Sequence, residues 1–283
     1  MAMSESVDEN LRRAVEFVKE SAGRGAKIVC LPEMFRSLYF CQREDVKLFD
    51  LAETIPGPST EALGKVAKDK GITVIAPVFE KRAIGLHHNS LAVLGNDGNI
   101  SGTYRKMHIP DDPAYYEKYY FVPGDLGWKT FETPEATIGT LICWDQWFPE
   151  GARLTALKGA EVLFYPTAIG WHPAEKDEVG KSQRDAWQTI QRSHAIANGV
   201  YVAAVNRTGH EVLTKGTDGI QFWGTSFVSD PFGVVLAEAG TDTEEILVVE
   251  IDRERMEDVR RNWPFLRDRR IEDYGDITKR FID

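Results

Sequence analysis

Helical patterns and short apolar runs alternate along the whole chain. This alternation restricts the possible folds more than any other feature of the sequence. Residues 10–23 carry apolar side chains at helical spacing, and glycines end this pattern before the apolar run 28–31. The same order recurs where a capped helix at 61–70 precedes the run 72–78, and where a long helix at 181–198 precedes 200–206. Helix and strand units in this order predict a mixed sheet with helices on its outer faces.

Further strands complete the predicted pattern. The segment SLAVLGNDGNISGTY, residues 90–104, predicts an antiparallel hairpin with its turn at 96–98. Pro149 is placed in the first turn of another helix. Other strands are expected at 137–143, at 161–167, in a pair within 226–238, and at 244–252. Because no Pro, Gly or Ser-rich linker interrupts the 283 residues, we expect a single domain over 1–283.

Composition excludes several classes of partner. The formal net charge of -10 argues against nucleic acid and anionic membranes, and it suits a cationic small molecule. Three cysteines form neither a disulfide framework nor a zinc-binding pattern, which favours a reducing compartment. No apolar run approaches the roughly 20 residues that span a bilayer, and the N-terminus is acidic rather than signal-like. We therefore expect a cytoplasmic protein that binds no membrane.

Cys143 is the candidate nucleophile. In LICWDQWFPEGAR, residues 141–153, it ends an apolar strand just before a helix signal. A helix N-terminus is one source of a lowered thiol pKa. The alternative is that Cys143 is a buried packing residue, as cysteines often are. We adopt that alternative for Cys30 and Cys41.

Two charged residues also stand at strand ends. Glu33 follows the run 28–31 in LPEMF, where apolar neighbours would desolvate its carboxylate and suit it to act as a base. Lys106 follows the second hairpin strand, where an ammonium could stabilise developing negative charge. Taken singly, each could equally be an ordinary surface charge.

Three segments together resemble the nitrilase, or carbon-nitrogen hydrolase, superfamily over essentially the whole chain. They are LPEMF, YRKMHIPDDPAYYEKYYFVPGD and LICWDQWFPEGAR, in this order. The resemblance implies an αββα sandwich of two mixed sheets between helix layers. It also implies that Glu33 is the general base, Lys106 the oxyanion-stabilising cation and Cys143 the nucleophile, with Glu117 as a second glutamate that orients the lysine and the substrate amide. Hydrolysis would pass through a thioester with no metal and no cofactor.

The substrate expectation also comes from the resemblance. The segments KMHIPDDPAYYEKYYFVPGD and CWDQWFPEGAR look most like superfamily members that hydrolyse N-carbamoylputrescine, a small cationic carbamoylated amine, to putrescine, carbon dioxide and ammonia in polyamine biosynthesis. The acidic segment 171–187 is expected to form a lid, on which Glu175, Asp177 or Glu178 would meet the distal ammonium. Alternatively it is a solvated loop.

Neighbouring residues have expected roles of their own. Trp144 and Trp147 would line the pocket beside Cys143, unless they serve only in packing. His108, two residues from Lys106, is expected to be a positioned hydrogen-bonding histidine rather than the base of a Cys-His hydrolase. His87 and His88 lack the spacing that places two metal ligands on one helix face.

Three alternatives remain open. A β-ureidopropionase or ω-amidase would bind a distal carboxylate, for which Arg207 or Arg153 could serve. Another amidase of the superfamily would share the chemistry with a different substrate. A non-enzymatic interaction protein with a vestigial site is the third, although the Glu33, Lys106, Glu117 and Cys143 set is intact.

The two ends of the chain carry separate expectations. Superfamily members normally begin with a strand, whereas only Met1, Ala2 and Met3 precede SESVDEN, so a late start would leave one sheet short of a strand and expose its edge. The tail 263–283 mixes aromatic residues with charges, and such tails in the superfamily often pack on a neighbouring subunit. We therefore expect a homo-oligomer built from dimers.

Overall fold

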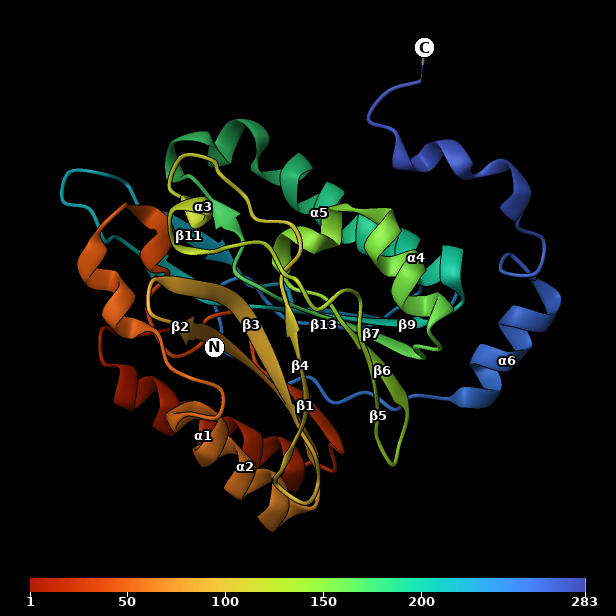
Figure 1. The fold of residues 1–283 in the computed structure, drawn as a ribbon, viewed down its shortest axis with the longest axis horizontal. Helices are drawn as coiled ribbons and strands as arrows, with labels where there is room; N and C mark the ends of the chain where they lie inside the picture. The colour runs from red at the N-terminus through yellow and green to blue at the C-terminus, as the bar shows by residue number, and fades with distance from the viewer. Residues whose placement is uncertain (283) are drawn as a thin grey trace.

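Two sheets pack face to face between helices, as Figure 1 shows for the computed structural model, which describes residues 1–282. Helices α1 (Val7–Gly23) and α2 (Pro58–Lys70) cover the first sheet. Helices α4 (Pro149–Leu157) and α5 (Lys176–Asn198) cover the second. The predicted four-layer αββα sandwich is therefore confirmed.

The first sheet holds four strands in chain order. They are β1 (Ile28–Cys30), β2 (Thr73–Ala83), β3 (Leu86–Leu94) and β4 (Ile100–Arg105). β1 runs parallel to β2, and the other neighbours are antiparallel. The predicted hairpin is present as β3 and β4, and β1 lies at the edge of the sheet.

The second sheet has six strands around a parallel centre. Its order is β13 (Val235–Glu238), β12 (Phe227–Ser229), β9 (Tyr201–Asn206), β7 (Val162–Thr167), β6 (Thr137–Thr140) and β5 (Thr130–Glu132). β6, β7 and β9 are parallel neighbours. A third, small sheet that the sequence did not indicate has the order β10 (Thr208–Glu211), β11 (Ile220–Trp223) and β8 (Gly170–Trp171).

Shorter elements complete the described chain. They are the helices α3 (Glu117–Tyr120) and α6 (Arg253–Asn262) and six 3-10 turns at Phe40–Gln42, Val46–Leu51, Cys143–Trp147, Pro173–Glu175, Ile271–Asp273 and Gly275–Thr278. Apolar side chains fill the space between the two large sheets, among them Ile75 and Val93 from the first and Ile138 and Val162 from the second. No helix within residues 1–282 combines the length and the apolar character needed to cross a membrane.

Three predicted helices begin earlier than expected, each for a local reason. α1 begins at Val7 because the Ser6 hydroxyl caps it, accepting a hydrogen bond from Glu9 N at 3.3 Å. Pro58 opens α2, since proline suits the first helical position. α5 begins at Lys176, so most of the segment predicted to be a lid is helical.

The predicted strand at 244–252 is wrong. No strand is present there, and the backbone groups of residues 247–251 make no hydrogen bond within the described chain. A strand requires a paired neighbour, whatever its own propensity. A cavity of about 480 Å³ is lined by Val248 and Val249 of this segment, and also by Val29 of β1 and by Leu31, which follows β1.

We predict that the amide hydrogens of residues 247–251 exchange with solvent far faster than those of β9, because only the β9 amides are held in a sheet. Hydrogen exchange followed by mass spectrometry of peptic peptides would measure this. Comparable protection of the two segments would show that residues 247–251 are paired in solution.

Candidate active site

Glu33 is fully buried just beyond the end of β1. One of its oxygens, Oε1, accepts hydrogen bonds from Lys106 Nζ at 2.9 Å and from Asn89 Nδ2 at 2.7 Å. The other oxygen, Oε2, is buried and has no partner within residues 1–282. The carboxylate is therefore held by one oxygen while the other stays available to accept a proton.

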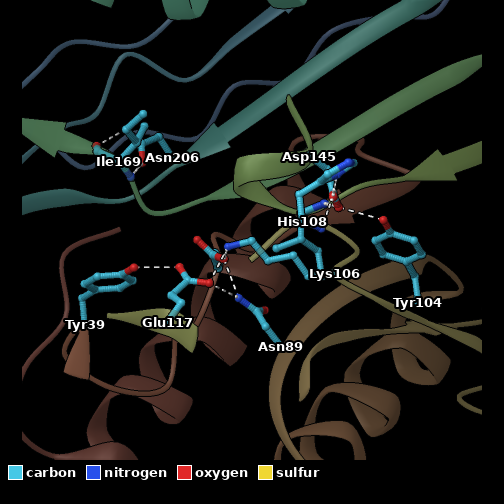
Figure 2. Close-up of polar contacts among 11 residues, drawn as sticks. Tyr39, Asn89, Tyr104, Lys106, His108, Glu117, Asp145, Ile169 and Asn206 are labelled. Atoms are coloured by element: carbon cyan, nitrogen blue, oxygen red, sulfur yellow. Dashed lines mark hydrogen bonds and ion pairs between the residues drawn. The ribbon is translucent and has the colours of Figure 1, made fainter. Parts of the chain in front are cut away.

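Lys106 joins this carboxylate to a second one. It directly follows β4, and its backbone N–H donates to Asn89 O at 2.8 Å, which extends the pairing of β4 with β3. Its Nζ also lies 2.7 Å from Glu117 Oε2, at the start of α3. Glu117 Oε1 in turn accepts from the Tyr39 hydroxyl at 2.7 Å, as Figure 2 shows. Glu33, Lys106 and Glu117 thus form one buried cluster.

Burial and opposing charges together set the ionisation of this cluster. Burial lowers the pKa of Lys106, but the negative charges of Glu117 and Glu33, joined by that of Cys143 whenever its thiol is ionised, outweigh burial and hold that pKa well above its usual value. Burial also raises the pKa of Glu117, and the Lys106 charge partly offsets this. The ammonium is therefore firmly protonated beside two carboxyl groups.

Cys143 begins a 3-10 turn at the end of the apolar run that contains β6. Its φ of 44° lies in the left-handed region, where a non-glycine residue is strained, as residues at functional sites often are. The side chain packs in the apolar cluster between the two sheets and is nearly inaccessible to solvent.

The expected lowering of the Cys143 pKa is not found. Burial raises that pKa, the Glu33 charge adds to the effect, and Lys106 opposes it only in part. The helix α4 begins at Pro149, beyond the 3-10 turn, so the thiol does not stand at its N-terminus. The resting thiol is therefore protonated and requires a base.

Asp145 holds the turn that carries Cys143. Its Oδ2 accepts from Ile142 N at 3.0 Å and from the Tyr104 hydroxyl at 2.7 Å. Its Oδ1 accepts from His108 N at 3.0 Å and lies 2.7 Å from His108 Nδ1 (Figure 2). The ring of His108 also stacks on Phe148 at 3.7 Å between centroids. His108 is thus a positioned hydrogen-bonding residue, as expected.

The residues predicted to contact the substrate make fewer contacts with one another than the buried cluster does. Trp144 and Trp147 follow Cys143 in the same turn, half-buried, with their ring centroids 6.3 Å apart. Glu175 and Glu178 are exposed around the start of α5, as is Asp177, and no ion pair within residues 1–282 involves their side chains. No contact connects these three acids to Cys143.

Neither arginine considered for an acidic substrate contacts the cluster. Arg207 is fully buried, with its Nη2 2.6 Å from Glu211 Oε1 and 2.9 Å from Ser37 O. Burial, and then the charge of Arg269 in the tail, lower the pKa of Arg153, which places this side chain near the tail. Cys30 and Cys41 pack in apolar clusters, as expected.

Three contacting residues were missed by the sequence analysis: Tyr39, Asn89 and Asp145. Asp145 stands within the quoted segment around Cys143, so its position could have drawn notice. Tyr39 and Asn89 give no signal in sequence, because their contacts arise only from packing and strand register. No group of three or more potential metal ligands occurs within the described part of the chain.

The arrangement can perform acyl transfer. A buried thiol lies in the field of a carboxylate with one free oxygen and of an ammonium, which are the groups that thiol attack on a carbonyl carbon requires. The fold and these groups define a hydrolase of the nitrilase type. A family model described as carbon-nitrogen hydrolase matches residues 1–261, and the chain belongs to this family of enzymes.

Individual relatives and a solved structure agree with this assignment. An N-carbamoylputrescine amidase of Solanum lycopersicum is 43% identical over 96% of this chain and 91% of its own length. A citrullinase of Francisella tularensis is 41% identical over 99% of this chain and 96% of its own. The crystal structure of a carbon-nitrogen hydrolase from Helicobacter pylori G27 has a TM-score of 0.96 and 47% identity, covering 99% of this chain and 97% of that one.

We predict that Lys106→Met costs about 3–5 kcal/mol of folding stability at pH 8, because it leaves two buried carboxylates without a cation. With Lys106 gone, burial and the Glu33 charge raise the folded-state pKa of Glu117 further above the unfolded value, and only the Tyr39 hydrogen bond still opposes them. The protonated form then favours the folded state, so the deficit should shrink as pH falls from 8 to 5.5.

Urea unfolding at both pH values measures this effect. Exposed Lys158→Met is the matched control, for which we expect little change at either pH. A Lys106→Met deficit that is equal at both pH values would contradict the charge-pairing explanation.

Proposed function

We propose that this enzyme hydrolyses N-carbamoylputrescine to putrescine, carbon dioxide and ammonia, a step of polyamine biosynthesis. The observation that carries the proposal is the buried Lys106 ammonium between Glu33 and Glu117 beside the Cys143 thiol. The similarity to the tomato N-carbamoylputrescine amidase over nearly the whole chain supports the substrate. The net charge of -10 suits a cationic substrate.

In the proposed first half-reaction, Glu33 takes the Cys143 proton and the sulfur attacks the carbamoyl carbon. Lys106 and the backbone N–H of Trp144 would hold the oxyanion of the tetrahedral intermediate. Protonated Glu33 then gives its proton to the departing amino group, which leaves as ammonia, and a thiocarbamate, the thioester-type intermediate of this substrate, remains on Cys143. Glu117 would keep Lys106 and the substrate amide oriented.

In the second half-reaction, water enters and Glu33 removes one of its protons as it attacks the thiocarbamate carbon. The C–S bond breaks and the proton returns to Cys143. The released carbamic acid decomposes to the amine and carbon dioxide. No step calls on a cofactor.

For the distal ammonium we propose the acids around the start of α5, Glu175, Asp177 and Glu178, with Trp144 and Trp147 as apolar walls and His108 at the rim. Exposure leaves the three carboxylates free to meet a cation. We place the enzyme in the cytoplasm, because its three cysteines are free thiols and suit a reducing compartment.

A second candidate substrate is citrulline, which carries the same ureido group. The similarity to the Francisella tularensis citrullinase favours it. Citrulline carries both an ammonium and a carboxylate at its distal end, and the substrates of β-ureidopropionase and ω-amidase carry a distal carboxylate. Each of these carboxylates needs a cation to bind it. Arg207 is paired with Glu211, and Arg153 lies toward the tail, so we assign neither of them to a substrate carboxylate. N-carbamoylputrescine, which has no carboxylate, is therefore our first choice.

We predict ammonia release from N-carbamoylputrescine that exceeds release from citrulline, N-carbamoyl-β-alanine and glutamine by at least about tenfold in kcat/KM, as a charge mismatch at the distal group costs more than 1.4 kcal/mol. Cys143→Ala should abolish turnover. Cys30→Ala, which removes a partly buried free thiol packed against the same apolar cluster, should retain it. Preference for citrulline would select the second candidate, and turnover by Cys143→Ala would refute the nucleophile.

We also propose that the tail 263–283 packs on a second copy of the chain. In Figure 1 the C-terminal segment projects away from the sandwich beyond α6. Its large apolar side chains are exposed, including Trp263, Ile271, Tyr274 and Ile277. So many apolar groups on one segment mark an interaction surface.

We predict that the full chain is a dimer or a larger assembly of dimers, and that a chain ending at Asn262 has a lower oligomeric state. Light scattering coupled to size-exclusion chromatography would measure both masses. Circular dichroism would confirm that the shortened chain keeps its fold. A monomeric full chain would rule out this role for the tail.

A further inference from the structure

One neutral side chain, Asn89, contacts both carboxylates of the cluster. Its Nδ2 lies 2.7 Å from Glu33 Oε1 and 3.5 Å from Glu117 Oε2, and the residue is 1% exposed. The Tyr39 hydroxyl, the other neutral donor, bonds to Glu117 alone. Asn89 is therefore the one neutral group, among the described residues, that bridges the two acids.

The backbone determines where this amide lies. Asn89 stands in β3, an inner strand between β2 and β4, opposite Phe79. Its carbonyl oxygen accepts the Lys106 N–H at 2.8 Å, so the two residues whose side chains converge on Glu33 Oε1 are also joined through their main chains. The amide is thus fixed relative to the ammonium.

Among the described residues, two donors bond to Oε1 and none to Oε2, which makes the two oxygens of Glu33 inequivalent. An amide N–H restrains the carboxylate without any capacity to give up its proton at physiological pH. We propose that Asn89 is a positioning residue that holds Glu33 Oε1 in place, so that Oε2 is the oxygen that takes the Cys143 proton. This inference rests on the base and nucleophile assigned under the proposed function.

A merely structural asparagine would affect stability alone, whereas a positioning residue also affects proton transfer. The amide donates to Glu33 Oε1, so its loss removes a hydrogen bond from the group that takes the thiol proton and moves the acid limb of thiol reactivity to higher pH. Six titratable groups sense the Glu33 charge, and none of them is substituted in the variants below: Lys106, Glu117, Cys143, Tyr39, Cys41 and Tyr115.

The test measures alkylation of Cys143 by iodoacetamide against pH, with mass spectrometry of the peptide that contains Cys143. No substrate is needed, so a wrong substrate assignment does not affect the result. Asn89→Leu keeps a similar volume without a donor, and Asn89→Ser keeps a shorter donor. Ser229→Ala is the matched control, since Ser229 is equally buried in β12 and its hydroxyl has no partner within residues 1–282.

For Asn89→Leu we expect the alkylation rate on the high-pH plateau of the profile to fall about tenfold, because misplacing a catalytic group lowers a rate by at least this much. We also expect an acid limb at higher pH. Asn89→Ser should lie between Asn89→Leu and the unchanged protein in both respects, and Ser229→Ala should match the unchanged protein. A folded Asn89→Leu with the original acid limb and plateau would overturn the proposal, as would equal behaviour of the Ser and Leu variants.

Glu33→Gln separates this inference from the function on which it rests. If Glu33 is the base, the acid limb disappears in Glu33→Gln, and the Asn89 comparison then decides the positioning role. An acid limb that persists in Glu33→Gln would overturn the base assignment itself and, with it, the proposal for Asn89.

Discussion

The Lys106 ammonium, buried between Glu33 and Glu117, is the interaction on which the rest of the site depends. Each buried ion costs several kcal/mol of desolvation even after relaxation, and only close pairing with further hydrogen bonds compensates for it. Tyr39 and Asn89 supply those further bonds. Three separate elements therefore have to meet at one point: the end of β1, the end of β4 and the start of α3.

This cluster also bears on how the proposed nucleophile, a thiol with a raised pKa, would react. Transfer of the Cys143 proton to Glu33 moves a negative charge from the carboxylate to sulfur and leaves the total charge around Lys106 unchanged. The ammonium then stabilises charge on either atom without any rearrangement of solvent. In such a site, the proposed reactivity depends on the relative positions of groups, not on a thiol that is ionised at rest.

The sequence pointed to candidate site residues where a chemically reactive side chain stands at a recognisable position in the local pattern of strands and helices. Charged residues or a cysteine directly after apolar runs identified Glu33, Lys106 and Cys143, and the resemblance added Glu117. Contacts made across strands were not predictable: Asn89 reaches Glu33 through the register of β3 and β4. The run 244–252 has a strand pattern, yet no strand within residues 1–282 pairs with it, so local propensity gave the wrong result.

Glu33 follows the least supported strand of the first sheet, and this connects the site to the fold. β1 has three residues, pairs with β2 alone, and its other edge faces the cavity that Leu31 and Pro32 also line. Backbone pairing therefore contributes little to holding the residues that lead to Glu33, the proposed base. Lys106 and Asn89, which extend from the better paired β4 and β3, hold the Glu33 carboxylate directly. The ion cluster thus helps to hold the segment that follows β1 in place, and that segment in turn positions Glu33 in the cluster.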